Sequence, residues 1–282
     1  MNVANGVAYA AEWLSRGPHA ERARPDAETL LLHLTGQNQA WLLAHGEDEF
    51  AMEMLGPYAD LVRRRFQGEP IQYIVGECEF YGLPFKVTRH VLIPRPETEH
   101  LVEKALELAG RFTHPRIVDV GTGSGAIAVA LAHKLSDAEI TATDLSQAAL
   151  TIARDNARRN RLDGRIRFLQ GDLLAPIVGE PFDGVVSNPP YVSTIDRESL
   201  SVEVREYEPE LALFAGEDGL DVYRGLIPAA YRVLVRGGFI VLEIGYGQAE
   251  GIENLLEANG FRSIEFTSDL QGIPRVASAQ RI

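Results

Sequence analysis

Cysteine is nearly absent from this chain of 282 residues, since Cys78 is the only one. A single thiol excludes an internal disulfide and any zinc site built from several cysteines, and it favours a reducing compartment. No apolar run reaches the roughly 18 to 20 residues that span a bilayer, and the first residues lack the basic and apolar segments of a signal peptide. These absences predict a cytoplasmic protein without a membrane anchor.

An excess of positive charge is also missing. The chain has 27 Lys and Arg against 40 Asp and Glu, a formal net charge of -13. This balance disfavours a surface built to neutralise many phosphates, although it permits a local basic patch. Hydrophobic residues at 45% and charged residues at 24% are ordinary for globular proteins, so disorder, collagen and coiled coils have little support.

The chain changes character near residue 70. Before it, apolar residues recur at helical spacing, as in Asp26 to Leu34 and Met52 to Phe66. Two β-prone runs joined through Gly82-Leu83-Pro84 then predict a hairpin over Glu77 to Val87. The expected domains are an N-terminal helical domain at 1–70, a β-hairpin linker at 71–92 and a catalytic domain at 93–282.

Beyond Pro115, strand-like and helix-like segments alternate. This alternation is typical of βαβ units, which form a mostly parallel sheet with helices on both faces. The last two strands follow a helix and are expected to add an antiparallel edge. The expected strands are 116–120, 139–143, 165–170, 183–187, 239–244, 262–266 and 276–282, and the expected helices are 97–109, 126–135, 147–160, 220–235 and 249–258.

A glycine-rich turn follows the first of these strands and opens an Ala-rich helix. Its residues are Gly121, Thr122, Gly123, Ser124 and Gly125. Glycines allow a sharp turn and a close backbone approach, so a nucleotide-like ligand can lie against amides at the helix N-terminus. The spacing is G-x-G-x-G, whereas a dinucleotide fingerprint is G-x-G-x-x-G, and the NAD interpretation is weakened accordingly.

Asp144 ends the second strand, 19 residues after Gly125, where an acid can accept hydrogen bonds from ribose hydroxyls. The glycine-rich turn and Asp144 together resemble the cofactor site of the Rossmann-like class I methyltransferases. The resemblance implies S-adenosylmethionine as the cofactor, with its methionine part on the turn and its ribose on Asp144. It also implies that Asp172 accepts from the adenine amino group and that Leu173 packs on the ring. A helix cap is an equally good explanation of Asp172.

The fourth strand runs into Asn188-Pro189-Pro190-Tyr191, at the sheet edge where ligands bind in open parallel sheets. The two prolines form a rigid frame without backbone donors. The Asn188 side-chain oxygen and the Pro189 carbonyl can each accept one N–H of a substrate NH₂ group, and Tyr191 can stack on a planar group. Asn188, Pro189 and Tyr191 are the expected catalytic residues. Asn188, Pro189, Pro190 and Tyr191 are the expected substrate-binding residues, and Asn188 also borders the cofactor.

This arrangement suits methylation of a planar, weakly nucleophilic nitrogen and requires no metal, because the cofactor carries the leaving group. All seven histidines lie at or before His133. A histidine base is therefore available only if the earlier segment folds over the site. We expect positioning to dominate the catalysis, with the proton lost after transfer.

Asn-Pro-Pro-Tyr is shared by adenine-N6 methyltransferases of nucleic acids and glutamine-N5 methyltransferases of proteins. Other segments separate the two groups. They are Phe80 to Phe85, Leu92 to Glu99, Tyr207-Glu208-Pro209 and the Asp269-Leu270-x-Gly272-x-x-Arg275 pattern. These segments resemble the peptide chain release factor glutamine N5-methyltransferase family almost from end to end.

This resemblance implies methyl transfer to the glutamine of the Gly-Gly-Gln motif in bacterial class 1 release factors. The implied partner is a protein, with no stable nucleic acid and no membrane, and a monomer is the default state. Nine acidic residues against two arginines between Asp196 and Asp221 agree with a basic protein partner, although solvation explains them equally well. Arg95 has a functional and a structural interpretation of equal weight. The alternatives are an adenine-N6 methyltransferase and a non-catalytic S-adenosylmethionine-binding protein.

Overall fold

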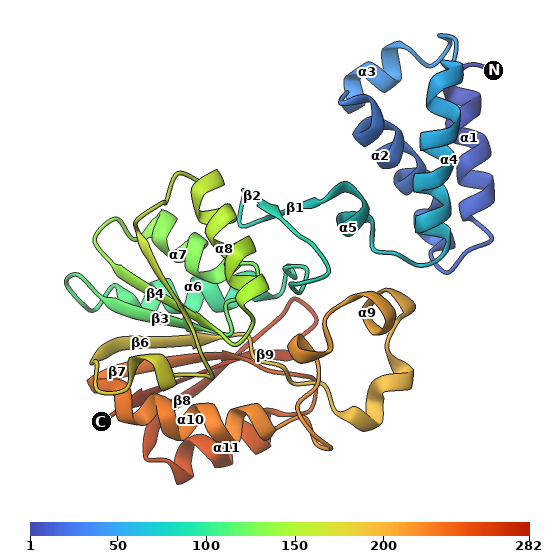
Figure 1. The fold of residues 1–282 in the computed structure, drawn as a ribbon. Coiled ribbons are helices and arrows are strands. Elements are labelled where there is room, and N and C mark those ends of the chain that lie inside the picture. The colour runs from blue at the N-terminus through green and yellow to red at the C-terminus, as the bar shows by residue number, and fades with distance from the viewer. The chain divides into compact units, whose positions relative to one another are not determined.

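A computed structural model describes residues 1–282, which form two compact units (Figure 1). Unit 1 comprises Met1–Glu77 together with Leu200–Tyr207, and unit 2 comprises Cys78–Ser199 together with Glu208–Ile282. A short stretch from the second half of the chain therefore packs with the N-terminal unit. None of the helices is both long and apolar enough to cross a membrane.

Unit 1 is helical. Its helices are α1 (Val3–Leu14), η1 (Ala20–Arg22), α2 (Ala23–Thr35), α3 (Gln39–Ala44), α4 (Met52–Phe66), α5 (Ile71–Val75) and α9 (Val202–Tyr207). Asn2 and Asn38 cap α1 and α3 by accepting from backbone N–H groups three residues further on. The apolar faces of α1, α2 and α4 meet in a core that also takes in Ile71 and Ile74. The helical core thus continues past residue 70, because these two side chains of the expected linker are apolar and buried in it.

Arg65 on α4 is a buried basic residue of unit 1 and is 3% exposed. Its Nε donates to Asp26 Oδ2 at 2.6 Å, and its Nη1 donates to the Glu69 carbonyl at 3.0 Å and to the Glu203 carboxylate. Tyr207 donates its hydroxyl to the Gln67 carbonyl at 3.1 Å. These contacts explain why residues 200–207 belong to unit 1.

Unit 2 starts within the hairpin of β1 (Glu77–Phe80) and β2 (Leu83–Lys86) and contains a seven-stranded sheet in the order β5-β4-β3-β6-β7-β9-β8. The sheet strands are β3 (Arg116–Val120), β4 (Glu139–Asp144), β5 (Ile166–Gln170), β6 (Phe182–Ser187), β7 (Leu234–Glu243), β8 (Phe261–Ser268) and β9 (Pro274–Arg281). The pairs from β5 to β7 are parallel, whereas β9 pairs antiparallel with both β7 and β8.

Helices cover both faces of this sheet (Figure 1). One core packs α6 (Thr98–Ala109), α7 (Ala126–Lys134) and α8 (Gln147–Arg159) on one face, and a second core packs α10 (Asp221–Val233) and α11 (Ala249–Ala258) on the other. Short 3-10 turns η2 (Ala175–Ile177), η3 (Thr194–Ser199) and η4 (Glu210–Ala212) lie in the connections. The expected doubly wound α/β fold with a helical N-terminal module is confirmed.

The expected strands and helices of unit 2 agree with the structure apart from their ends. The largest difference is β7, which begins at Leu234 rather than at 239. Arg236-Gly237-Gly238 has the composition of a turn, but these residues continue the strand across an irregular register between Phe182 and Gly184 of β6.

Candidate active site

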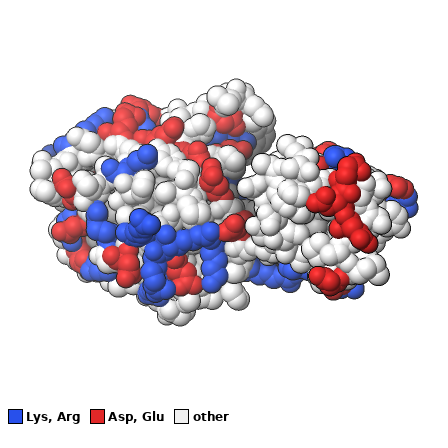
Figure 2. Space-filling view, turned by 90° about the horizontal axis from the view of Figure 1, so that it is seen from above, with Lys and Arg blue, Asp and Glu red and all other residues white.

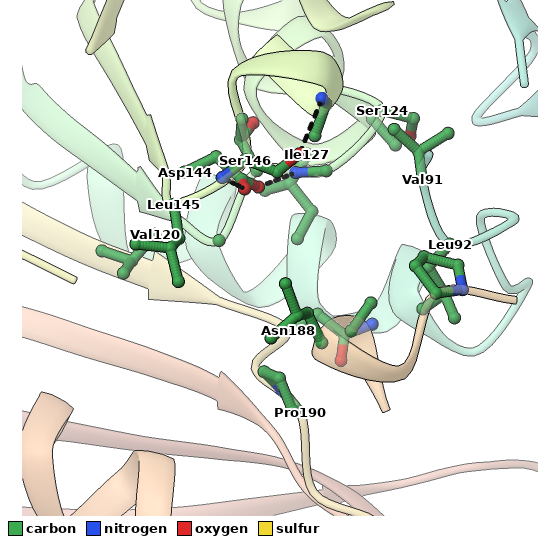
Figure 3. Close-up of a pocket in the computed structure, with 18 of the residues that line it drawn as sticks. Val91, Leu92, Val120, Ser124, Ile127, Asp144, Leu145, Ser146, Asn188 and Pro190 are labelled. Atoms are coloured by element: carbon green, nitrogen blue, oxygen red, sulfur yellow. Dashed lines mark hydrogen bonds between the residues drawn. The ribbon is translucent and has the colours of Figure 1, made fainter. Parts of the chain in front are cut away.

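A cavity of 340 Å³ lies in unit 2 at the carboxyl ends of β3, β4 and β6. The strand order reverses between β3 and β6, and such a switch point is where open α/β sheets bind ligands. Figure 3 shows Asp144, Leu145 and Ser146 on one side of this cavity, with Asn188 and Pro190 across from them.

The glycine-rich turn adopts a backbone that only glycine accepts easily. Gly121, Gly123 and Gly125 have φ values of 70°, 54° and 81°, all in the left-handed region. A Cβ at Gly125 would also meet the Ala153 Cβ of α8 at 3.0 Å. The three glycines are therefore required by the turn itself and by its packing on α8.

Asp144 holds this turn in place. Its Oδ2 accepts from the Gly123 N–H at 2.8 Å, and its Oδ1 accepts from the Ser146 N–H at 2.8 Å. Burial raises the pKa of Asp144, while the two backbone donors oppose that rise. Each carboxylate oxygen has a second lone pair, so Asp144 can still accept from a ligand hydroxyl in the cavity.

Asn156 on α8 supports the turn from behind and is fully buried. Its Nδ2 donates to the Ser124 carbonyl at 2.8 Å and to the Lys86 carbonyl at 3.0 Å, and its Oδ1 accepts from the Lys86 N–H at 2.7 Å. One amide therefore links the turn, α8 and the hairpin.

Asp119 was not singled out by the sequence, yet it is the most perturbed carboxyl beside the turn. Its Oδ2 accepts from Thr122 Oγ1 at 2.6 Å and from the Ala128 N–H at 3.2 Å, whereas its buried Oδ1 has no partner. The pKa of Asp119 is raised to about 7, mainly by burial and also by the Asp144 charge, against the lowering effect of its two hydrogen bonds. The raised pKa values of both carboxyls follow from their burial beside the turn.

The Asn-Pro-Pro-Tyr segment meets the same cavity. Asn188 and Pro190 line it, whereas the buried Pro189 and the half-buried Tyr191 do not. Asn188 Nδ2 donates to Thr98 Oγ1 at 3.2 Å, and the Tyr191 hydroxyl donates to Glu243 Oε1 at 3.2 Å. Burial and the Glu243 charge both raise the pKa of Tyr191.

Most of the expected site residues thus border one space. Those that line the cavity are Gly121, Thr122, Gly123, Ser124, Asp144, Asp172, Leu173, Asn188 and Pro190, while Gly125, Pro189 and Tyr191 do not. The segment before α6 does fold over the site, since His90, Val91 and Leu92 also line it. A histidine is therefore present at the cavity, and its side chain is exposed.

Arg95 is engaged elsewhere. Its Nη2 pairs with Glu208 Oε2 at 2.6 Å, and the Glu208 side chain is 1% exposed. Arg95 does not line the cavity, but Pro209, directly after Glu208, does. The ion pair therefore anchors the start of a wall that continues through Leu211, Ala212 and Phe214.

Thr98 and Glu243 are functional candidates that the sequence did not reveal. Thr98 begins α6 and Glu243 ends β7, and their side chains are joined by a 2.6 Å hydrogen bond. The available signals were the position of Thr98 within the Leu92 to Glu99 segment and, for Glu243, a lone acid at the end of the apolar run Phe239 to Leu242.

Comparison with known proteins adds two family models. Residues 98–204 match the methyltransferase small domain, and residues 9–76 match the PrmC N-terminal domain. The release factor glutamine methyltransferase of Moorella thermoacetica is 45% identical over 93% of this chain and 92% of that protein. The protein of the same name from Koribacter versatilis is 41% identical over 92% of this chain and 91% of that protein.

The chain belongs to the release factor glutamine methyltransferase family.

Solved structures agree with the fold of this family. The ribosomal protein L11 methylase of Lactobacillus delbrueckii subsp. bulgaricus aligns with a TM-score of 0.50 at 26% identity, covering 67% of this chain and 81% of that one. The T. thermophilus 16S rRNA N2 G1207 methyltransferase was solved with AdoMet and guanosine. It aligns with a TM-score of 0.56 at 20% identity, covering 73% of this chain and 50% of that one. Unit 2 is accordingly a class I methyltransferase domain, and the family membership makes the protein a methyltransferase.

Proposed function

We propose that this enzyme transfers a methyl group from S-adenosylmethionine to the side-chain amide nitrogen, N5, of the glutamine in the Gly-Gly-Gln motif of bacterial class 1 release factors. The observation that carries the proposal is the cavity that Asn188 of the Asn-Pro-Pro-Tyr segment shares with the glycine-rich turn and Asp144. Because the substrate is a translation factor, we place the reaction in the cytoplasm.

S-adenosylmethionine would supply an activated methyl group on a positively charged sulfur. The turn from Gly121 to Gly125 offers backbone amides to its methionine part, and the Asp144 carboxylate offers acceptors to its ribose. Asp172 and Leu173, which line the cavity beyond β5, would face the adenine. The packing surface for the adenine ring would be the aliphatic side chain of Leu173.

The substrate amide needs two acceptors because its nitrogen carries two hydrogens. No protein group donates to Asn188 Oδ1, which is therefore available for one N–H, and the Pro189 carbonyl would take the other. Fixing both hydrogens aligns the nitrogen with the methyl donor and so lowers the entropic part of the barrier. The Tyr191 hydroxyl is held by Glu243, and its ring, which does not line the cavity itself, would supply a flat surface beside it for the planar amide.

Charge agrees with a protein substrate rather than with an extended nucleic acid. The formal net charge is -13, and Figure 2 shows both acidic and basic side chains on the visible face, with one band of Lys and Arg and one group of Asp and Glu. Strong phosphate binding relies on many unpaired basic side chains on one surface. Relatives at 40–45% identity carry the name of a protein-modifying enzyme, which also favours the protein substrate.

The test offers purified enzyme and labelled S-adenosylmethionine a bacterial class 1 release factor or, separately, adenine-containing DNA and RNA. We expect label on the release factor alone. Label on the nucleic acids alone would support the adenine-N6 alternative. Cofactor binding without any labelled product would support a non-catalytic binder.

The matched variants are Asn188→Ala and Asn259→Ala, since Asn259 lies at the end of α11 outside the cavity. Asn188→Ala should abolish turnover and leave cofactor binding largely intact, whereas Asn259→Ala should change neither turnover nor cofactor binding. Unchanged turnover of Asn188→Ala would refute the role of Asn188.

A further inference from the structure

A chain of buried polar groups stands behind the Asn188 amide. Asn188 Nδ2 donates to Thr98 Oγ1 at 3.2 Å, and Thr98 Oγ1 donates to Glu243 Oε2 at 2.6 Å. Thr98 is 4% exposed and Glu243 is 2% exposed. Asn188 thus reaches the end of β7 through a single threonine hydroxyl at the start of α6.

The direction of each hydrogen bond follows from the chemistry of the groups. An ionised carboxylate only accepts, so Thr98 must give its single hydroxyl hydrogen to Glu243. The threonine oxygen then presents only a lone pair to Asn188. The Asn188 amide must turn its NH₂ group to Thr98, because the reversed amide would set two acceptors against each other. Oδ1 is thereby directed to the side away from Thr98.

We propose that Glu243, acting through Thr98, is a positioning residue that fixes the Asn188 amide in the one orientation able to accept an N–H of the substrate. The inference rests on the proposed function, in which Asn188 Oδ1 accepts from the substrate amide. A reversed Asn188 would offer a donor to a substrate donor and could not hold it. The other Glu243 oxygen accepts from the Tyr191 hydroxyl, so one carboxylate holds both ends of the Asn-Pro-Pro-Tyr segment.

The Glu243 carboxylate can be protonated, and so lose its charge, within an accessible pH range. The pKa of Glu243 is raised to about 7, mainly by burial and also by the Glu97 charge, against the lowering effects of the donors Thr98 and Tyr191 and the cation Arg275. The remaining titratable neighbour, Tyr223, donates its hydroxyl to the Glu243 main-chain oxygen at 2.6 Å. A protonated Glu243 can donate to Thr98, which frees the threonine hydrogen for Asn188 Oδ1 and allows the amide to reverse.

The experiment compares Thr98→Val, Thr98→Ser and Glu243→Gln with the wild-type enzyme. We expect Thr98→Val and Glu243→Gln to lower kcat/KM for the release factor by about 10- to 100-fold, as for a mispaired buried hydrogen bond, with cofactor affinity within about twofold of wild type. Thr98→Ser keeps the hydroxyl and should recover activity to within about threefold of wild type.

The control variant is Tyr223→Phe, which removes a buried hydroxyl from the Glu243 main chain but not from its carboxylate. Tyr223→Phe should keep kcat/KM within about threefold of wild type. A loss of kcat/KM as large as that of Thr98→Val would mean that removing any buried hydroxyl near Glu243 lowers activity, which would contradict a specific role of Thr98. Circular dichroism identifies variants that do not fold, and the pH profile of the wild-type enzyme then still tests the proposal. Its activity should fall as the pH drops through about 7, and Glu243→Gln should lack this acidic limb.

Full activity of Thr98→Val, or an unchanged acidic limb in Glu243→Gln, would overturn the proposal. A measurement on the enzyme without substrate distinguishes failure of this positioning role from failure of the proposed function. In protein labelled with ¹⁵N-asparagine, the Asn188 side-chain amide hydrogen bonded to Thr98 should exchange slowly in wild type and quickly in Thr98→Val. Equal exchange would contradict the positioning role whatever the true substrate is.

Discussion

Replacing Asp144 by Asn tests how the second strand contributes to cofactor binding. The carboxylate accepts from two backbone N–H groups, of Gly123 and Ser146, each at 2.8 Å. An amide has only one oxygen, so one of these donors would face an NH₂ group. The variant also loses the charged acceptor that we propose for the ribose hydroxyls.

The expected magnitude follows from these contacts. Losing one charge-assisted hydrogen bond costs about 1.5 to 3 kcal/mol, which corresponds to a rise of about 10- to 150-fold in the Kd for S-adenosylmethionine. Folding stability should fall by no more than about 1 to 3 kcal/mol, because one backbone donor loses its acceptor while the neutral amide relieves the desolvation that raises the pKa of Asp144. The variant should therefore bind its cofactor weakly while remaining folded.

Isothermal titration calorimetry with S-adenosylmethionine measures the Kd, and thermal unfolding without cofactor measures stability. Asp137→Asn is the matched control, since Asp137 precedes β4 at its opposite end and does not line the cavity. If Asp144→Asn binds within about threefold of Asp137→Asn, the assigned role of Asp144 is wrong.

Two further predictions concern buried charges. Arg65→Met should destabilise unit 1 by about 3 to 5 kcal/mol, because it leaves the buried Asp26 without its close partner, while Arg63→Met on the exposed face of the same helix should cost under about 1 kcal/mol. Both tryptophans, Trp13 and Trp41, lie in unit 1, so their fluorescence during urea unfolding reports the stability of this unit. Equal urea midpoints for Arg65→Met and Arg63→Met would contradict the prediction. Burial raises the pKa of Asp119 from 3.8 to about 7, so the folded state holds this proton more tightly than the unfolded state and loses on the order of 4 kcal/mol as the pH rises through that range. Asp119→Asn should lack this loss when unfolding, followed by circular dichroism, is compared at about pH 5 and about pH 8, and an identical pH dependence in the variant would refute it.

The sequence revealed features that depend on local chemistry. Gly121, Gly123 and Gly125 were found because a left-handed backbone needs glycine, and Asp144 was found because acids at strand ends have a known use. The alternating strands and helices of unit 2 followed from their periodicity, so the fold class and most elements could be predicted.

Features that depend on packing between distant segments were not visible in the sequence. Arg65 and Glu203 are 138 residues apart, and neither carries a motif that predicts their contact. Thr98 and Glu243 are 145 residues apart and became candidates only when the fold joined α6 to the end of β7. The raised pKa values of Asp119 and Glu243 likewise come from burial, which a single sequence does not specify for an individual acid.

In the proposed reaction, the methyl group goes to the side-chain amide nitrogen of a glutamine. The most direct measurement is acid hydrolysis of a release factor that the enzyme has labelled with S-adenosylmethionine carrying a radioactive methyl group. Hydrolysis cleaves side-chain amides, so we expect the label to leave as methylamine and the Gly-Gly-Gln peptide before hydrolysis to be heavier by one methyl group. Label that stays on an amino acid after hydrolysis, or on any other peptide, would contradict it.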